Sequence, residues 1–560
     1  MEGLKNAVFN LPKSIQYLIV IALCIAANLN TLNNEYALDD VVVLTENNIV
    51  KKGVAGIPEI IRTDYFKGYN LTNTKLSAAR YRPVSLIVFA IEYQLFGLNP
   101  IISHSLNILL YTFLVALLFY LLSNELFSPG SFIPFAAVLL FALHPVHSEV
   151  VANVKGRDEI LVFIFLALSM VAFLKSRCDK SKLLLIVSSL LFLIALLTKE
   201  TAITYIGVFP LVLYFFKGES ILSSTKSVVS FIISLLVYLI IRYYFIGFSN
   251  SNVSDITNSP YVLASGPEAF ATKIFVIGKY FLLLLFPFSL TSEYGFNQIP
   301  YVNLSSWQFV VSFAILLVLI GWAIKEFSKK SLISFSVFYM LITLSVGTNL
   351  FFDFGAPMAE RMLFLPSLGF CMLLAYLLKS NVKKFSLMVI AVLILPIYAY
   401  CTINRNSEWK NNETLFLADI KKSSQSSRLN LFVSEVYIKR AEREAQLESK
   451  QLYLDSALFF VNKSLEIQPN YSYSFLRLGL IMFYQGDAKM AAKNWLRARE
   501  LDPKNPDCIK WTKELCKWFI EEGKGFEKNG NEQKAFEYYD YALKLDSTSV
   551  HLILGANEIE

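Results

Sequence analysis

Two adjacent carboxylates, Asp39 and Asp40, follow the first long apolar run of the sequence, which covers residues 15–29. That run is about long enough to cross a bilayer, which takes roughly 20 residues. A charge at such a depth costs on the order of 3 kcal/mol to bury, so charges there tend to be functional. A carboxylate in this place can act as a general base and take the proton of a hydroxyl group. The alternative is the start of a solvated loop, unless other polar residues converge on the same face.

More polar side chains stand at the ends of later apolar runs that we place at the same membrane face. They are Arg82, Glu92, His104, Asn107, His144, His147, Glu149, Arg157, Asp158, Glu159, Lys199, Glu200, Glu293, Glu360 and Arg361. The loops at the opposite face carry mostly plain Lys and Arg. This asymmetry predicts a polar reaction cavity at the outer surface. Structural ion pairs between helix ends are the competing interpretation for each residue, most of all for Arg157, Asp158 and Glu159.

The chemistry that suits this set is glycosyl transfer from a lipid-phosphate sugar. The acceptor hydroxyl needs a carboxylate that accepts its proton, and the leaving phosphate needs Arg or Lys to hold its developing negative charge. We therefore predict Asp39 as the general base, with Asp40 assisting it or taking its role, and Arg361 and Lys199 at the donor phosphate. The residues predicted to line the site are Arg82, His104, His144, His147, Glu149, Arg157, Asp158, Glu200 and Glu360.

A metal ion is a further option at this face. His144 and His147, together with Asp39 or Asp40, could bind a divalent cation. Hydrogen bonding at a helix end is the more frequent use of such histidines, so the sequence makes no cofactor certain and leaves a divalent cation open. The six Cys residues are scattered without metal-ligand spacing, so they imply neither a zinc site nor a disulfide scaffold.

The composition indicates a polytopic helical membrane protein. Of the 560 residues, 55% are hydrophobic and only 17% are charged, against about 25% charged in soluble proteins. The eleven apolar runs predicted to cross the membrane are 15–29, 101–122, 133–143, 160–174, 183–197, 202–216, 228–245, 307–324, 332–350, 362–378 and 387–403. The segments 83–96 and 274–288 are predicted to be helices on the outer surface, with a re-entrant helix or a further span as alternatives for the second.

The distribution of Lys and Arg predicts the orientation, because basic residues favour the cytoplasmic side. Lys5 and Lys13 place the N-terminus inside, and basic clusters at 175–182 and 379–384 mark further inner turns. Eleven crossings from an inside start leave the C-terminal part outside.

The composition becomes polar and charged from residue 405, so we predict a membrane domain at 1–404 and a second domain at 405–560. Residues 472–505 match the 34-residue tetratricopeptide (TPR) pattern, with related copies near 438–471 and 516–549. Such repeats stack into a concave groove that binds extended peptides or partner helices. The predicted fold class is therefore all-α, with a helical membrane bundle followed by a TPR α-solenoid.

Several motifs together resemble a known family. Asp39-Asp40, Arg82-Pro83 and Gly97-Leu-Asn-Pro resemble integral-membrane glycosyltransferases of the GT-C fold. His144-Pro-Val-His-Ser-Glu, Gly156-Arg-Asp-Glu, Lys199-Glu and Ala359-Glu-Arg-Met-Leu-Phe-Leu-Pro-Ser-Leu-Gly are similar to motifs of the transmembrane and tetratricopeptide-repeat-containing O-mannosyltransferases. The resemblance implies dolichyl- or polyprenyl-phosphate mannose as donor and Ser or Thr hydroxyls of proteins as acceptor. The chain departs from the family in its short array of about three repeats, and its Asn, Lys, Ile and Phe-rich composition would suit a bacterial relative.

We therefore predict a multi-pass membrane enzyme that transfers a sugar, mannose, to a protein acceptor held by the TPR groove. Its predicted place is a bacterial inner membrane with the repeats in the periplasm, or the endoplasmic reticulum membrane with the repeats in the lumen. Its predicted partners are the polyprenyl-phosphate sugar, the acceptor and membrane lipids, without nucleic acid. The alternatives are sugar transfer to a lipid or glycan acceptor, and a non-catalytic TPR receptor or assembly factor. A transporter is a weaker alternative, because transporter sites lie near the bilayer midplane and the predicted spans lack central charges.

Overall fold

The computed structural model describes residues 11–69, 80–247, 260–351, 355–381 and 384–549, and these are predominantly helical without a β-strand. The chain divides into two compact units. The first unit runs to Ala418, except for Gly295–Gln298, and the second consists of Gly295–Gln298 together with the chain from Asp419 onward. The all-α prediction is confirmed.

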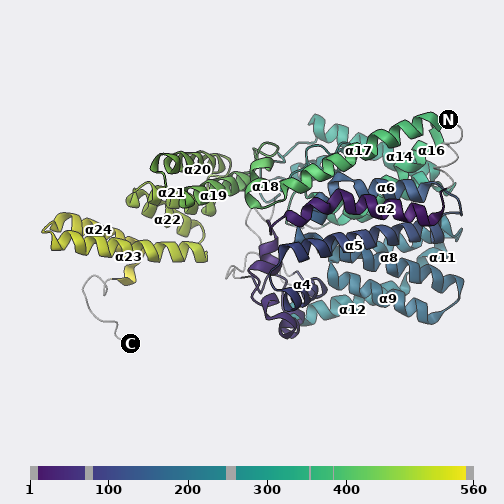
Figure 1. The fold of residues 1–560 in the computed structure, drawn as a ribbon, viewed down its shortest axis with the longest axis horizontal. Coiled ribbons are helices and arrows are strands. Elements are labelled where there is room, and N and C mark those ends of the chain that lie inside the picture. The colour runs from purple at the N-terminus through teal and green to yellow at the C-terminus, as the bar shows by residue number, and fades with distance from the viewer. Residues whose placement is uncertain (1–10, 70–79, 248–259, 352–354, 382–383, 550–560) are drawn as a thin grey trace. The chain divides into compact units, whose positions relative to one another are not determined.

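The first unit is a bundle of long apolar helices (Figure 1). Its main helices are α2 (Lys13–Asn28), α4 (Pro83–Phe96), α5 (Pro100–Tyr120), α6 (Ile133–Leu143), α8 (Arg157–Cys178), α9 (Lys182–Thr198), α10 (Tyr205–Phe216), α12 (Val229–Ile246), α13 (Gly266–Leu285), α14 (Trp307–Phe327), α15 (Leu332–Leu344), α16 (Phe364–Asn381), α17 (Lys384–Glu408) and α18 (Asn412–Asp419). Short helices between them are α3 (Ile57–Arg62), α7 (Ser148–Ala152) and α11 (Ile221–Lys226).

Several helices begin where the sequence supplies a cap or a proline. The Asn99 side chain accepts a hydrogen bond from the Ile102 amide at the start of α5, and Ser181 does the same for Leu184 at the start of α9. Proline at the first turn of α4, α5 and α6 suits a helix start, because its missing N–H would have had no partner there.

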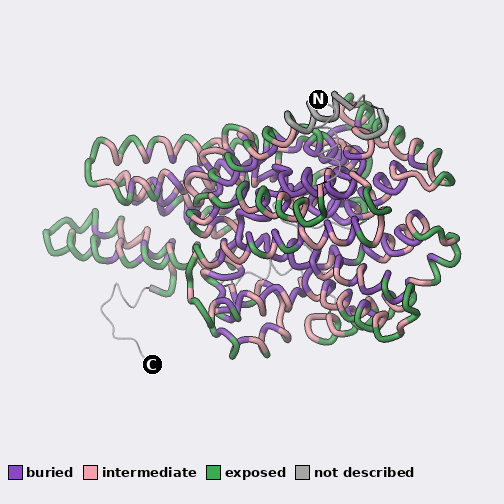
Figure 2. The backbone as a smooth tube through the Cα atoms, turned by 45° about the vertical axis from the view of Figure 1, so that its right-hand side comes forward, coloured by how far each residue is buried: buried purple, intermediate pink, exposed green. Residues whose placement is uncertain are grey.

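Nearly every residue of α8 from Arg157 to Phe173 is buried, and buried segments fill the interior of the first unit (Figure 2). Helix α9 packs closely against α8, and the two exchange hydrogen bonds between Ser169 and Ser188, at 2.8 and 2.7 Å. Phe209 of α10 stacks on Phe231 of α12, with ring centroids 3.7 Å apart. In contrast, α14 exposes most of its apolar side chains. Apolar surface of that kind fits contact with lipid.

Among the described residues, six helices are long and apolar enough to cross a membrane, or seven if the bent pair Ile133–Leu143 and Pro145–Ala152 forms one span. Shorter apolar helices are Pro83–Phe96, Lys182–Thr198, Glu200–Phe216 and Leu332–Thr348. The chain is a multi-pass membrane protein. Each of the eleven runs predicted to cross contains a helix, although several are too short to span by themselves, so the count of eleven crossings stays a prediction.

Two segments differ in detail from the sequence-based interpretation. Helix α6 has the predicted bounds, but the chain then bends by 52° at His144-Pro145 and continues as a short helical segment. Helix α13 begins eight residues before the predicted 274–288 run, at the Ser265–Glu268 capping box. It is absent from the helices that are apolar enough to span, and its role as a surface or re-entrant helix stays a prediction.

The second unit contains three helix hairpins. They are α19 (Ser427–Arg443) with α20 (Leu447–Ile467), α21 (Ser472–Tyr484) with α22 (Ala488–Leu501), and α23 (Pro506–Lys528) with α24 (Glu532–Leu545). Helices α21 and α22 lie within the predicted repeat 472–505, and the turn between them is at Gly486-Asp487. The assignment of these hairpins to the TPR class, and the domain bounds 1–404 and 405–560, stay predictions.

Helices α21 and α22 meet at a glycine. The Trp495 indole donates a hydrogen bond to the Leu476 carbonyl at 2.8 Å, and a Cβ placed on Gly479 would lie 2.4 Å from the indole nitrogen. The indole therefore occupies the space that any larger residue at position 479 would need.

We expect Gly479→Ala to destabilise the second unit by about 1–3 kcal/mol, because the added methyl group forces the helices apart or breaks the indole hydrogen bond. Gly525→Ala on α23 is the matched control, since nothing lies within 4 Å of a Cβ there. Thermal unfolding of the two purified variants, followed by tryptophan fluorescence, measures the difference. Equal stability of both variants would contradict this account of the contact.

Candidate functional site

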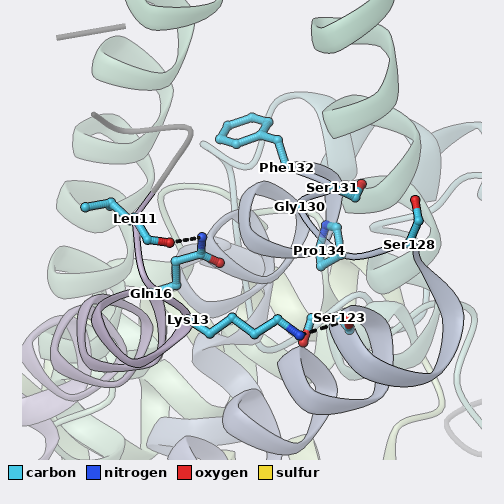
Figure 3. Close-up of a pocket in the computed structure, with 9 residues that line it drawn as sticks. All are labelled: Leu11, Lys13, Gln16, Ser123, Ser128, Gly130, Ser131, Phe132 and Pro134. Carbon is cyan, nitrogen blue, oxygen red and sulfur yellow. Dashed lines mark hydrogen bonds between the residues drawn. The ribbon is translucent and has the colours of Figure 1, made fainter. Parts of the chain in front are cut away.

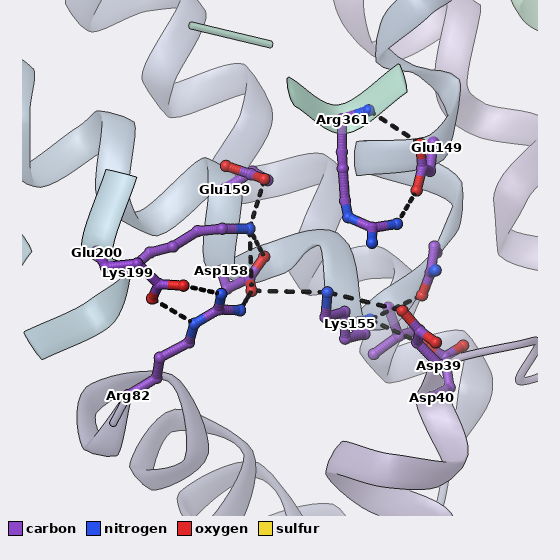
Figure 4. Close-up of polar contacts among 12 residues, drawn as sticks. Asp39, Asp40, Arg82, Glu149, Lys155, Asp158, Glu159, Lys199, Glu200 and Arg361 are labelled. Carbon is purple, nitrogen blue, oxygen red and sulfur yellow. Dashed lines mark hydrogen bonds and ion pairs between the residues drawn. The ribbon is translucent and has the colours of Figure 1, made fainter. Parts of the chain in front are cut away.

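A cluster of charged side chains comes from the starts of α4 and α8, the end of α9, helix α7 and short segments between helices (Figure 4). We call it the charged cluster, and it consists of Asp39, Asp40, Arg82, Glu149, Lys155, Asp158, Glu159, Lys199, Glu200 and Arg361. Nine of these ten residues are in the set that the sequence predicted. The structure brings these nine predicted residues together and adds Lys155, whereas the other predicted residues, among them the three histidines, Arg157 and Glu360, lie outside the charged cluster.

Asp158 is the centre of the charged cluster. Its side chain is fully buried, in the first turn of α8, where the helix dipole favours a negative charge. Arg82 donates a hydrogen bond to Asp158 Oδ2 at 3.1 Å, and the Lys199 ammonium lies 3.3 Å from both carboxylate oxygens. Lys155 Nζ lies 3.9 Å from Asp158 Oδ2. One buried carboxylate thus joins cations from three segments of the chain.

Two further carboxylates complete the pairing of these cations. Glu200 receives two hydrogen bonds from Arg82, through Nε at 2.8 Å and Nη2 at 2.5 Å, which is the bidentate geometry that makes such pairs strong. Glu159 pairs with Lys199, and both side chains are almost fully buried. The Lys199 ammonium therefore has carboxylate partners on both sides, which leaves it poorly placed for the donor phosphate that the sequence assigned to it.

Asp39 and Asp40 are adjacent in the sequence but have different surroundings. The Asp40 side chain is buried, and its two oxygens accept hydrogen bonds from the backbone amides of Ala37 at 2.9 Å and Lys155 at 2.7 Å. The Asp39 side chain is 38% exposed, and its Oδ2 lies 3.7 Å from Lys155 Nζ. Asp40 thus ties two segments together, whereas the Asp39 carboxylate is the more accessible one of the pair.

The backbone before Asp39 has an uncommon conformation. Leu38 has a φ of 50°, in the left-handed region that residues other than glycine rarely adopt. The Leu38 amide donates a hydrogen bond to Asn412 Oδ1 at 2.7 Å, which helps to hold this conformation. Strain of about 1–3 kcal/mol persists only where surrounding contacts enforce it, and such residues cluster at functional sites.

Arg361 and Glu149 form a second pair beside this centre. Glu149 accepts hydrogen bonds from the Arg361 backbone amide at 2.9 Å and from its guanidinium. The Arg361 side chain remains 20% exposed, and Figure 4 shows its guanidinium beside Glu149, above Lys155 and Asp39. The preceding residue, Glu360, is buried and accepts a hydrogen bond from the Tyr294 hydroxyl at 2.8 Å. Arg361 therefore keeps a partly exposed cationic group, whereas Glu360 ties this segment to Thr291 and Tyr294.

Arg157 belongs to a separate buried group. Its guanidinium pairs with Glu92, donates to Asn107 Oδ1 at 2.8 Å and to the Ser103 carbonyl at 3.0 Å, and lies over the Phe89 ring. All of these groups are buried and mutually satisfied. The geometry favours the structural ion-pair interpretation for Arg157, which ties α4 and α5 to the start of α8.

The three histidines of the predicted site lie apart from the aspartates. His147 is buried between the Tyr111 hydroxyl and the Ser367 hydroxyl, at 2.8 Å each. His144 Nε2 lies 3.1 Å from the Leu284 carbonyl, and His104 Nε2 lies 3.3 Å from the Glu35 carbonyl. Among the described residues, no group of three or more His, Cys, Asp or Glu could hold a metal ion. The structure does not bring His144 and His147 to Asp39 or Asp40, so that donor set does not fit a divalent cation.

Lys155 is the functional candidate that the sequence interpretation missed. It precedes Gly156-Arg157-Asp158-Glu159 directly, so its place next to a charged motif was a usable signal. Arg157, Asp158 and Glu159 start helix α8, whereas Lys155 lies in the short turn Val154–Gly156 before that helix.

A cavity of about 230 Å³ opens at the other end of α2, near Lys13 (Figure 3). The Lys13 ammonium donates a hydrogen bond to Asn124 Oδ1 at 2.6 Å there. The lining of this cavity is Leu11, Lys13, Gln16, Ser123, Ser128, Gly130, Ser131, Phe132 and Pro134, which includes no carboxylate. Without a general base, this cavity does not suit the predicted chemistry.

The relatives reported below, found by comparison with known proteins, are all named protein O-mannosyl-transferases. The chain is 26% identical to "Protein O-mannosyl-transferase F38B6.6" of Caenorhabditis elegans over 75% of this chain and 59% of that protein. It is 24% identical to "Protein O-mannosyl-transferase TMTC3" of Mus musculus over 95% of this chain and 64% of that protein. It is 27% identical to "Protein O-mannosyl-transferase TMTC4" of Homo sapiens over 72% of this chain and 61% of that protein. The chain thus spans about three fifths of the length of these relatives.

Two other comparisons complete this picture. No protein-family model matches the chain. Among solved structures, the crystal structure of ArnT from Cupriavidus metallidurans bound to undecaprenyl phosphate aligns with 96% of this chain and 77% of that chain, at 11% identity and a TM-score of 0.38.

The charged cluster predicts that Lys199 is structural. We expect Lys199→Met to destabilise the protein by about 3–5 kcal/mol, because it leaves Glu159 buried without its ammonium partner. Lys182→Met, at an exposed lysine on the same helix, is the control and should change stability little. Thermal unfolding in detergent measures both, and a Lys199→Met variant as stable as the control would refute the structural role.

The surroundings of Asp40 predict that the stability of the folded protein depends on pH. Burial raises the pKa of the Asp40 carboxyl to about 7, although the two backbone amides oppose this effect. The folded protein then binds the Asp40 proton more tightly than the unfolded chain, so the stability contributed by this proton is present below about pH 4. It is lost as the pH rises from about 4 through 7.

We therefore expect the stability difference between the wild type and Asp40→Asn to shrink as the pH rises through this range. Thermal unfolding at several pH values measures it, with Glu35→Gln as the exposed-carboxylate control. A difference that grows with pH would show instead that the amide hydrogen bonds outweigh burial.

Proposed function

We propose that this chain is a membrane glycosyltransferase that moves a sugar, mannose, from a polyprenyl- or dolichyl-phosphate donor to Ser or Thr hydroxyls of proteins. The observation that carries the proposal is a partly exposed carboxylate, Asp39, held beside Lys155 and within electrostatic reach of Arg361. The relatives support the sugar and the acceptor class, because each is named a protein O-mannosyl-transferase. The activity of the longer relatives is extended to this chain as part of the proposal.

The residues fit one reaction. Asp39 accepts the proton of the acceptor hydroxyl as the hydroxyl oxygen forms a bond to the anomeric carbon of the sugar. The bond from that carbon to the phosphate oxygen breaks, and its electron pair stays on the phosphate. Arg361 holds the charge that develops there, because a guanidinium can donate two parallel hydrogen bonds to phosphate. No step requires a metal ion, and the histidine donor set does not fit one.

This assignment divides the roles that the sequence left open. Asp39 is the base, and Asp40 fixes the loop that carries it, since both Asp40 oxygens are occupied by backbone amides. Arg361 keeps its predicted role at the donor phosphate. Lys199 is assigned to structure instead, because Asp158 and Glu159 already occupy its ammonium group.

The orientation completes the proposal. We place the charged cluster and the second unit on the outer side of the membrane, which is the periplasm of a bacterium or the lumen of the endoplasmic reticulum. The Lys and Arg distribution supports this placement, because basic residues favour the cytoplasmic face. The helix hairpins of the second unit would then hold the protein acceptor on the side where Asp39 lies.

The test of this proposal is transfer of labelled mannose from a polyprenyl-phosphate donor to a Ser/Thr-containing protein by the purified chain. We expect Asp39→Asn to lower the rate by about 10²–10⁴-fold, the usual effect of losing a general base, while the variant still folds. Glu35→Gln, at an exposed carboxylate four residues earlier, should keep the wild-type rate. An Asp39→Asn variant with undiminished transfer would disprove the role of Asp39, and a wild type that transfers sugar only to lipid would disprove the protein acceptor.

A further inference from the structure

We propose that Lys155 is a positioning residue that holds the general base Asp39 in its ionised form and in place for the acceptor. This inference rests on the proposed function and deepens it. Lys155 contacts both aspartates by different groups: its backbone amide donates to Asp40 Oδ1 at 2.7 Å, and its ammonium lies 3.7 Å from Asp39 Oδ2. One residue therefore fixes the loop and sets the charge environment of the base.

The turn that carries Lys155 is closely determined. The Asn153 side chain accepts a hydrogen bond from the Lys155 amide at 3.1 Å. A Cβ placed on Gly156 would lie 2.3 Å from the Val150 carbonyl oxygen, so only glycine fits there. Asn107 donates a hydrogen bond to the Asn153 carbonyl at 3.1 Å. These contacts leave Lys155 little freedom, and its side chain is only 8% exposed.

The Lys155 ammonium is shared between the carboxylates of Asp39 and Asp158. Asp158 already has two nearer cationic partners, Arg82 at 3.1 Å and Lys199 at 3.3 Å, against 3.9 Å for Lys155. Among the described residues, the Lys155 ammonium lies within 4 Å of the Asp39 and Asp158 carboxylates and donates no hydrogen bond at shorter range. Lys155 therefore lies nearer to Asp39 than to Asp158, and the electrostatic neighbours of Asp39 include Asp40, Arg361 and Tyr65.

The consequence for the reaction is a defined pH dependence. An ammonium within about 4–6 Å favours the ionised carboxylate and lowers its pKa by about 1–3 units. Removing the Lys155 charge therefore makes Asp39 harder to ionise, and the acidic limb of the profile of kcat/KM against pH moves toward higher pH. A residue that merely fills space would leave that limb where it is.

The first experiment compares Lys155→Met with Lys155→Arg in the mannosyl-transfer assay with the full chain. We expect the acidic limb of Lys155→Met to move up by about one pH unit and kcat to fall about tenfold below the limb, while KM for the donor stays within about threefold. Lys155→Arg keeps the charge and should return the limb most of the way to its wild-type position. Lys410→Met, at an exposed lysine whose carbonyl accepts from the Glu35 amide, is the control without a shift. An unmoved limb in Lys155→Met would overturn the proposal.

A second experiment does not depend on activity. Thermal unfolding of Asp39→Asn, Lys155→Met and the double variant forms a double-mutant cycle, and we expect the double variant to lose less stability than the two single losses combined. Additive losses would overturn the proposed pairing even in an active enzyme. A wild type that is inactive on every acceptor, with non-additive losses, would instead count against the proposed function while the pairing stands. The two failures are therefore distinguishable.

Discussion

The charged cluster depends on the burial of the Asp158 carboxylate, whose negative charge needs cationic partners. Removing an isolated carboxylate from water costs several kcal/mol of free energy, and only surrounding cations and hydrogen bonds offset this penalty. Arg82 before α4, Lys155 before α8 and Lys199 at the end of α9 all meet at this one side chain. Because each cation also has a second carboxylate, the ends of three helices are fixed relative to one another. The position of Asp39 beside Lys155 follows from that arrangement.

The two aspartates show how one short motif can carry two functions. Asp40 is buried, and both of its carboxylate oxygens accept hydrogen bonds from backbone amides. These bonds join the 37–40 loop to the turn before α8. That anchoring, together with the Asn412 contact, holds Leu38 in its left-handed conformation. Asp39 is then turned outward with a partly exposed carboxylate. In the proposed mechanism, positioning by Asp40 and proton transfer by Asp39 are separated between neighbours, so substitutions at the two sites should act on different properties.

Much of the membrane fold follows from the sequence, because apolar runs and their capping residues are local signals. The run 133–143 has the same bounds as α6, and the polar residues that interrupt other runs mark the helix ends that meet in the charged cluster. The sequence could not show which of these polar side chains pair with one another. His144 and His147 have the spacing of metal ligands. In the structure, however, His147 Nε2 forms a hydrogen bond with the hydroxyl of Ser367, which lies far along the chain. The Lys199 ammonium pairs with the Asp158 and Glu159 carboxylates, which lie about forty residues earlier in the sequence. The sequence around Lys199 therefore does not reveal that its charge is already paired. Such partners are set by helix packing rather than by local pattern.

The pairing also indicates which part of the charged cluster can respond to a ligand. Arg82, Lys199, Asp158 and Glu159 are buried and mutually neutralised, so an arriving phosphate would have to break those pairs to reach them. Arg361 and Asp39 keep partly exposed side chains, and Lys155 has no close hydrogen-bond acceptor among the described residues for its ammonium. The buried pairs give rigidity where the helix ends meet, and the proposed mechanism places the substrate at the partly exposed edge of the charged cluster. Catalysis of this kind depends on charges that are fixed in advance of the reaction, and the buried half of the cluster is what fixes them.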